Sequence, residues 1–219
     1  MKEASSSTAP TSTPSPTRLW LIRHAEVEAA YQGVFGGRID MNLSPTGQEQ
    51  AACLADYLKV HQIDAVYASP MKRVQQTLAP FVASKPAKSF TVPEFREVDF
   101  GQWTGLKWAE VHEKFGISAF AWLEELEKAT IVGAESAQKL RARVEPALRR
   151  VIEQHHGRQV ALFCHGGVIR SMLSILLHWP LPRLAAFQVE YASVTRVAAW
   201  PHAAELQLLN FTPWRDLPR

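Results

Sequence analysis

The sequence has little cysteine and little net charge. Its only two cysteines, Cys53 and Cys164, lie far apart and belong to no C-x-x-C pair. This argues against a disulfide framework or a zinc site and for a reducing compartment. The balance of 24 basic and 21 acidic residues leaves a net charge of +3, and no block of lysine or arginine occurs. We therefore expect a cytoplasmic protein that binds no nucleic acid.

Long apolar segments are also missing. No run approaches the ~20 residues of a membrane span. The longest candidate, "VIRSMLSILLHWPL", is interrupted by Arg170, Ser171, Ser174 and Pro180, so it predicts a buried helix and no membrane segment. Residues 1–17 are nearly all serine, threonine, proline and alanine, without the apolar core of a signal peptide. They predict a disordered tail, with an early start codon as the open alternative, before a single domain over residues 18–219.

The rest of the chain alternates between strand-like and helix-like segments. Apolar runs predict strands over 18–24, 64–70, 90–95 and 159–165, and residues 185–200 with 206–211 predict two or three more. Helices are expected over 44–61, 71–84, roughly 105–128, 136–156 and 166–179. Ser44 and Pro45 are typical of a helix start. The alternation predicts an α/β fold, a three-layer α/β/α sandwich with a mainly parallel central sheet.

Two of the predicted strands end on a histidine. "RLWLIRH" ends on Arg23 and His24, and "QVALFCH" ends on His165. Because ligands bind beyond the carboxyl ends of parallel strands, both histidines are expected at one rim of the sheet. Each is followed by a small residue, Ala25 or Gly166, that lets a ligand approach the backbone closely. The helix expected to begin at Gly166 would offer free amides that favour an anion.

An arginine and two carboxylates extend this candidate site. Arg73 lies one turn into the helix expected after "YASP", where a cation gains nothing from the helix dipole. Its guanidinium would match phosphate oxygens, and a solvated surface arginine is the alternative. The stretch "FREVDFGQWTG" carries Glu97 and Asp99 beside aromatic rings, which raise a carboxyl pKa and suit a general acid. Either carboxylate fits this role, and a loop that only packs its aromatic rings on the core is the other interpretation.

Four motifs together resemble a known family. "LIRHAE", "SPMKRVQQT", "FREVDFGQWTG" and "CHGGVIR" occur in the order typical of the histidine phosphatase superfamily, which includes phosphoglycerate mutases. The resemblance implies that His24 is a nucleophile that forms a phosphohistidine, kept neutral by nearby arginines. Arg23, Arg73 and His165 would clamp the transferring phosphoryl group. Glu97, at the family's position, would protonate the leaving alcohol and then activate water, and the resemblance implies neither a metal nor a cofactor.

The resemblance also implies a set of substrate-binding residues. The segment "VFGGRID" matches the family's substrate loop, so Gly36 and Gly37 would offer backbone amides. Arg38 would reach the substrate beyond its phosphate, with a solvated arginine as the alternative. Trp103 and Trp108 are the tryptophans expected to line the cleft.

The chain departs from the family pattern at three positions, one of them in "VGAES" (132–136), which lacks one glycine of the usual "GGES". Ala25 replaces the glycine of the usual Arg-His-Gly-Glu motif, and Ala30 stands where many members have an asparagine that contacts the phosphate. A binding module that has lost its chemistry on the same fold is therefore an alternative. Against it, all five residues that the chemistry needs are present.

The spacing of the motifs separates a phosphatase from a mutase. Cofactor-dependent mutases carry a long basic insertion between the acid and the second histidine, whereas Glu97 and His165 are 68 positions apart (165 − 97). We therefore predict a phosphatase that acts on a small phosphorylated metabolite, with mutase-type transfer as the alternative. The compact layout resembles that of α-ribazole phosphatases, which implies α-ribazole 5′-phosphate as a substrate. Edge strands near the C-terminus leave a homodimer open.

Overall fold

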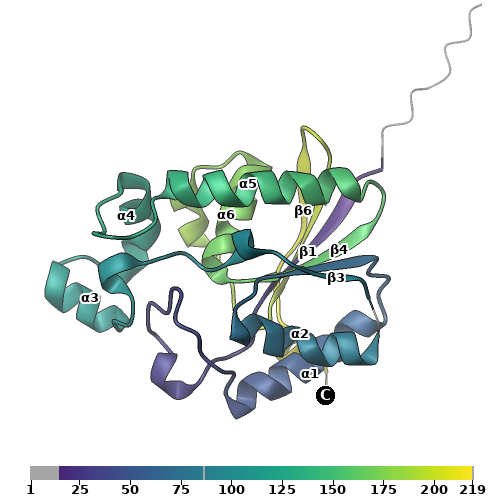
Figure 1. Ribbon diagram of the computed structural model, residues 1–219, viewed down its shortest axis with the longest axis horizontal. Helices are drawn as coiled ribbons and strands as arrows, with labels where there is room; N and C mark the ends of the chain where they lie inside the picture. Colours follow the sequence, from purple (N-terminus) through teal and green to yellow (C-terminus); the bar gives the residue numbers. More distant parts are fainter. Residues whose placement is uncertain (1–14, 86, 219) are drawn as a thin grey trace, which may run out of the picture.

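A six-stranded sheet runs through the described part of the protein, with helices on both faces (Figure 1). The structure is a computed structural model and describes residues 15–85 and 87–218. In spatial order the strands are β3 (Ser89–Thr91), β2 (Ala65–Ala68), β4 (Gln159–Cys164), β1 (Thr17–Arg23), β5 (Val194–Ala199) and β6 (Ala204–Phe211). Strands β3, β2, β4 and β1 pair in parallel, while β5 is antiparallel to both of its neighbours. The predicted, mainly parallel sheet is confirmed.

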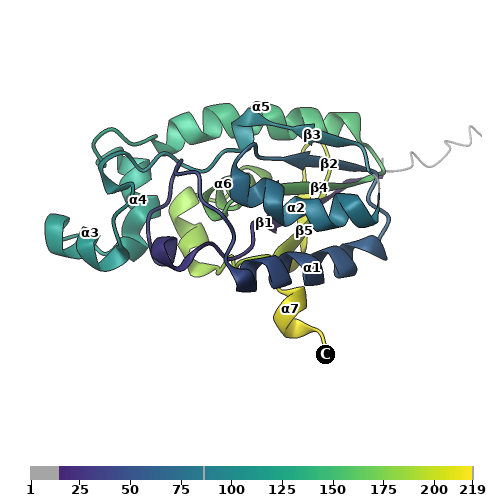
Figure 2. The ribbon, with the colours of Figure 1, turned by 60° about the horizontal axis from the view of Figure 1, so that its bottom comes forward.

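The helices form two layers around this sheet. They are α1 (Pro45–Lys59), α2 (Lys72–Ser84), α3 (Trp108–Phe115), α4 (Trp122–Lys128), α5 (Ala137–Gln154), α6 (Gly166–Leu177) and α7 (Pro213–Asp216). Helices α1 and α2 cover one face and α5 and α6 the other, while α3 and α4 lie beyond one end of the sheet (Figures 1 and 2). The three-layer sandwich is confirmed. In residues 15–85 and 87–218, no helix has the length and apolarity needed to cross a membrane.

The central strand β1 shows why the sequence folds in this way. Its side chains alternate between faces, so Leu19 and Leu21 enter the core beneath α5 and α6 while Trp20 and Ile22 enter the core beneath α1 and α2. All four are at most 1% exposed. A strand covered on both faces needs a continuous apolar run, and the first polar side chain after that run, Arg23, is placed at the carboxyl end.

Two predicted elements are shorter in the structure. The helical stretch expected over 105–128 divides because Gly116 ends α3 in the left-handed conformation (φ +67°), and a 3₁₀ helix over Ala119–Ala121 precedes α4. The strand expected over 90–95 ends at Thr91. Pro93 lacks the amide hydrogen that would continue the ladder and opens a 3₁₀ helix.

The ends of the chain also differ from expectation. Strand β1 begins at Thr17, whose buried hydroxyl donates to the carbonyls of Ile152 and His155, so the last residue of the predicted tail lies in the sheet. Residues 1–14 of that tail lie outside the described residues. The segment 185–193, expected as a strand, begins in a 3₁₀ helix and continues as loop and turn, and β5 begins only at Val194. Strand β6 forms one edge of the sheet, and its pairing with a second copy stays a prediction.

Candidate active site

The five candidate catalytic residues converge at the carboxyl ends of β1 and β4. Four of them, Arg23, His24, Arg73 and Glu97, line a cavity of about 590 Å³. The fifth, His165, follows β4 and is fully buried, with its ring centroid 5.2 Å from that of His24. Positions separated by up to 142 residues (165 − 23) therefore meet at one rim, as the strand pattern predicted.

The environment of His24 leaves a lone pair on one of its two ring nitrogens. Its Nδ1 lies 2.8 Å from the carbonyl oxygen of Ala25, which only accepts, so Nδ1 carries the proton and Nε2 keeps a lone pair. The Nε of Arg73 donates to this Nε2 at 3.2 Å. Burial first, and then the charges of Arg73 and Arg23, lower the pKa of His24 well below its ordinary value. The imidazole is therefore neutral at pH 7, as attack on phosphorus requires.

Arg73 is a buried and firmly held cation. It is 2% exposed, and its guanidinium donates to the carbonyls of Ile39 at 2.8 Å and Gly37 at 3.0 Å. Burial lowers the pKa of Arg73 to about 10, which still leaves it charged at pH 7. Because its hydrogen bonds join the 37–39 loop to the start of α2, Arg73 orders the loop beside His24.

Arg23 holds the opposite wall of the cavity. Its Nη1 donates to the carbonyl of Val189 at 2.6 Å, and its guanidinium lies 4.0 Å from the ring centroid of Tyr191. Its Nε is buried without a partner among the described residues, and so is the Nδ1 of His165. Buried polar groups normally have a hydrogen-bond partner. Two orphaned nitrogens beside His24 therefore indicate a ligand with oxygen acceptors.

Glu97 reaches the same cavity from the loop after the 3₁₀ helix at 93–95. Its carboxylate accepts from the amides of Val98 at 2.9 Å and Gly167 at 3.4 Å, which fixes it against the start of α6. Asp99, the competing acid, instead accepts from the amide of Gly101 and lies 3.6 Å from the Nη1 of Arg38, and neither Asp99 nor Arg38 lines this cavity. The geometry favours Glu97 as the acid.

Three of the four substrate-binding candidates lie at the cavity, and the fourth does not. Gly36, Gly37 and Gly166 line the cavity. Gly37 has a φ of +48°, and this left-handed conformation turns its carbonyl to the guanidinium of Arg73. The structure does not bring Arg38 to the cavity, because its side chain is 52% exposed and paired with Asp99.

Aromatic side chains form much of the cavity wall. The aromatic lining residues are Tyr31, Phe35, Phe100, Trp108, Trp122, Phe120, Phe187 and Tyr191. The interpretation of Trp108 as a lining residue is confirmed, whereas Trp103 is 1% exposed and belongs to the core. Most of the other aromatic lining residues come from separate segments that only the fold brings together, so nothing in the sequence marked them as lining residues.

Arg170 is a further lining residue that the sequence analysis did not assign. It lies one helical turn after Gly166 and donates to the carbonyls of Leu184 at 3.3 Å and Phe187 at 2.9 Å. These bonds hold the 184–187 segment over α6. Its helical spacing from Gly166 was a signal that could have identified it.

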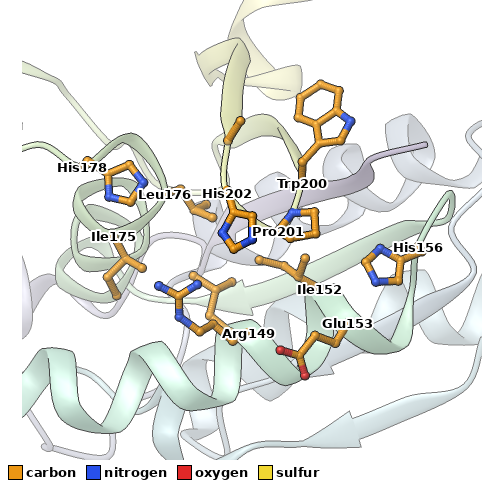
Figure 3. Close-up of a pocket in the computed structure, with 12 residues that line it drawn as sticks. Arg149, Ile152, Glu153, His156, Ile175, Leu176, His178, Trp200, Pro201 and His202 are labelled. Atoms are coloured by element: carbon orange, nitrogen blue, oxygen red, sulfur yellow. The ribbon is translucent and has the colours of Figure 1, made fainter. Parts of the chain in front are cut away.

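A second, smaller cavity lies at the opposite end of the sheet. It measures about 200 Å³ and lies between the ends of α5 and α6 and the turn from β5 to β6. His156, His178 and His202 border it (Figure 3). No group of three or more histidines, cysteines, aspartates or glutamates in the described part of the chain is arranged to hold a metal ion. The cavity around His24 is therefore the better candidate for chemistry.

Comparisons with known proteins agree with this geometry. Residues 19–212 match the family described as "Histidine phosphatase superfamily (branch 1)". "Phosphoserine phosphatase 1" of Hydrogenobacter thermophilus is 31% identical over 195 residues, which cover 89% of this chain and 92% of that protein. The crystal structure of the α-ribazole phosphatase from Shigella flexneri is 27% identical with a TM-score of 0.77, covering 90% of this chain and 97% of that one.

A third relative was solved with an oxyanion bound. It is the mycobacterial glucosyl-3-phosphoglycerate phosphatase in complex with VO₃, which is 26% identical with a TM-score of 0.77 and covers 89% of this chain and 98% of its own. The family match covers nearly the whole of the described chain and all four motifs. The protein belongs to branch 1 of the histidine phosphatase superfamily and is a phosphatase.

Proposed function

We propose that the protein hydrolyses phosphomonoesters of a small metabolite without a metal, through a phosphohistidine on His24. The observation that carries this proposal is the tautomer of the neutral His24, whose Nδ1 proton is held by the Ala25 carbonyl. Its Nε2 accepts from Arg73, and the charges of Arg73 and Arg23 both act on the ring. A neutral nucleophile among fixed positive charges is the arrangement that phosphoryl transfer needs.

The reaction proceeds in two balanced steps. In the first, Nε2 of His24 bonds to phosphorus, the ester P–O bond breaks, and protonated Glu97 gives its proton to the leaving alcohol. In the second, water attacks the phosphohistidine, Glu97 takes back a proton, and the P–N bond breaks to release inorganic phosphate. Arg23 and Arg73 neutralise the charge on the phosphoryl oxygens in both steps, and His165 donates a hydrogen bond to them.

The aromatic wall supports a substrate with a flat apolar group. The relatives named above act on different esters by their names, so the family leaves the substrate open. Trp108 and Phe120 line the cavity, are 49% and 76% exposed, and meet edge to face with centroids 5.7 Å apart. Exposed rings of this kind mark a binding surface. They suit the benzimidazole base of α-ribazole 5′-phosphate better than the charged amino acid of phosphoserine.

A mutase and an inactive binding module remain the competing functions. A doubly phosphorylated, carboxylated ligand needs cations beyond the first phosphate. Arg38 pairs with Asp99 away from the cavity, and the guanidinium of Arg170, which does line it, donates to the carbonyls of Leu184 and Phe187. An inactive module has no need of a nucleophile with a fixed tautomer, which His24 has.

A panel of esters tests the proposal. We would measure hydrolysis of p-nitrophenyl phosphate, α-ribazole 5′-phosphate, phosphoserine and 3-phosphoglycerate with EDTA present, by wild type and His24→Ala. We expect turnover that survives EDTA and disappears in the variant, with the highest kcat/KM on α-ribazole 5′-phosphate. Trp108→Ala should lower kcat/KM for that ester more than for phosphoserine. Conversion of 3-phosphoglycerate to 2-phosphoglycerate would favour the mutase, and no turnover by the folded protein would favour the binding module.

A further inference from the structure

Ser69 lies beside the second histidine, on the side away from the nucleophile. It follows β2, and because β4 is between β2 and β1 in the sheet, His165 at the end of β4 is flanked by Ser69 and His24. The Oγ of Ser69 is 2.9 Å from the Nε2 of His165, and both residues are fully buried. The other ring nitrogen of His165, Nδ1, has no partner among the described residues.

The hydrogen bonds around Ser69 determine where its single hydroxyl proton points. The amide of Met71 donates to Oγ at 3.4 Å, so this contact uses an oxygen lone pair and not the proton. No acceptor other than Nε2 of His165 is within reach of the hydroxyl in the described residues. Since a buried hydroxyl donates where an acceptor is available, the Ser69 proton is directed to Nε2.

We propose that Ser69 is a positioning residue that holds His165 in the Nδ1–H tautomer, so that the orphaned Nδ1 donates to a phosphoryl oxygen. This inference rests on the proposed function. A neutral imidazole has one N–H, and with Nε2 accepting from Ser69 that proton lies on Nδ1. The opposite tautomer would aim a lone pair at the phosphoryl oxygens and would leave the Ser69 hydroxyl without an acceptor. The site is thus complementary to the phosphoryl group before it binds.

The tautomer can be read directly from the protein. Long-range ¹H–¹⁵N spectra of the ¹⁵N-histidine-labelled chain distinguish a protonated from an unprotonated ring nitrogen, and His165→Ala assigns the signals among the 8 histidines. The variants are Ser69→Ala, which removes the donor, and Ser69→Cys, which keeps the size but donates weakly. Ser174→Ala is the matched control, because Ser174 is 6% exposed and donates one hydrogen bond, at 2.6 Å, to the carbonyl of Trp179 at the far end of α6.

We expect Nδ1 of His165 to be protonated in the wild type and in Ser174→Ala. In Ser69→Ala the proton should redistribute towards Nε2. The inhibition constant of inorganic phosphate should rise, and kcat/KM should fall, by about 10- to 100-fold. This change corresponds to the loss of one hydrogen bond to a charged group. Ser69→Cys should show a smaller loss in the same direction, and it provides the test should Ser69→Ala not fold.

Two results would overturn the inference. One is an unprotonated Nδ1 in the wild type, and the other is a Ser69 variant whose phosphate affinity falls while the tautomer stays unchanged. The spectra and a direct titration with phosphate need no turnover. An inactive wild type would therefore refute the proposed function alone, while the tautomer test would still report on Ser69.

Discussion

Replacing Arg143 with methionine removes a guanidinium that ties α5 to the segment carrying Glu97. Its Nε and Nη2 donate to the carboxylate of Glu135 at 2.6 Å and 2.8 Å. The same group donates to the carbonyls of Glu94, Arg96 and Glu97. One side chain therefore holds the main chain at the candidate general acid, 46 positions away in sequence.

The expected loss of stability in Arg143→Met follows from the burial of the ion pair. The side chains of Arg143 and Glu135 are 19% and 8% exposed, and removing one partner of a buried pair costs about 3–5 kcal/mol. Because Arg143 is partly exposed, we expect about 3 kcal/mol, which lowers the Tm of a domain of this size by roughly 6–12 °C. Arg143→Met/Glu135→Gln should be more stable than Arg143→Met, because it leaves no unpaired buried charge.

Urea and thermal unfolding measure this effect, with Arg141→Met as the control on the same helix. Arg141 pairs with Glu145 at 2.7 Å but is 50% exposed, so its removal should cost under about 1 kcal/mol. In activity assays, Arg143→Met should lower kcat/KM more for an alkyl phosphate than for p-nitrophenyl phosphate, whose leaving group needs no proton. Equal losses of stability in Arg143→Met and Arg141→Met would refute the reasoning. A double variant less stable than Arg143→Met would refute it as well.

Two further predictions concern pH and packing. His24 and His165 both have a pKa lowered well below 6.5, chiefly by burial. Below about pH 6.5 the unfolded chain therefore takes up protons that the folded chain does not, and the free energy of unfolding falls by up to about 1.4 kcal/mol for each pH unit of acidification and for each histidine. Urea unfolding between about pH 6.5 and pH 5.5 should show a smaller slope in His24→Gln, and an unchanged slope would contradict the assignment. Gly167→Ala places a Cβ 2.6 Å from the Oε1 of Glu97 and 2.7 Å from a methyl group of Val98. It should lower kcat on alkyl phosphates about 10-fold or more by displacing the acid, and wild-type kinetics on these esters would contradict it.

Much of the fold was predictable because strands buried on both faces have a simple signature. The run from Leu19 to Ile22 could only be a central strand, and the polar residues after it had to lie at its carboxyl end. The positions of His24 and His165 follow from this pattern alone. The local sequence marked Arg73 and Glu97 as candidates but left a solvated arginine and a packing loop as equal alternatives, so their assignment depended on the family motifs.

The rest of the site depended on tertiary contacts. The segment from Phe187 to Tyr191 has the apolar alternation of a strand but forms no named strand, and it is tied instead to Arg23 and Arg170. Arg38 follows a glycine with a φ of +48°, and its guanidinium lies by Asp99. A backbone turn of this kind changes the direction of a side chain without any signal in residue type.

The central claim is that the phosphoryl group passes through His24. The most direct measurement is to quench the enzyme during turnover of p-nitrophenyl phosphate and to locate the phosphoryl group by mass spectrometry at alkaline pH, where phosphohistidine survives. The geometry of Nε2 predicts phosphate on the peptide that contains His24, and none in His24→Ala. A turning-over enzyme with its phosphoryl group on another residue, or on none, would contradict the account.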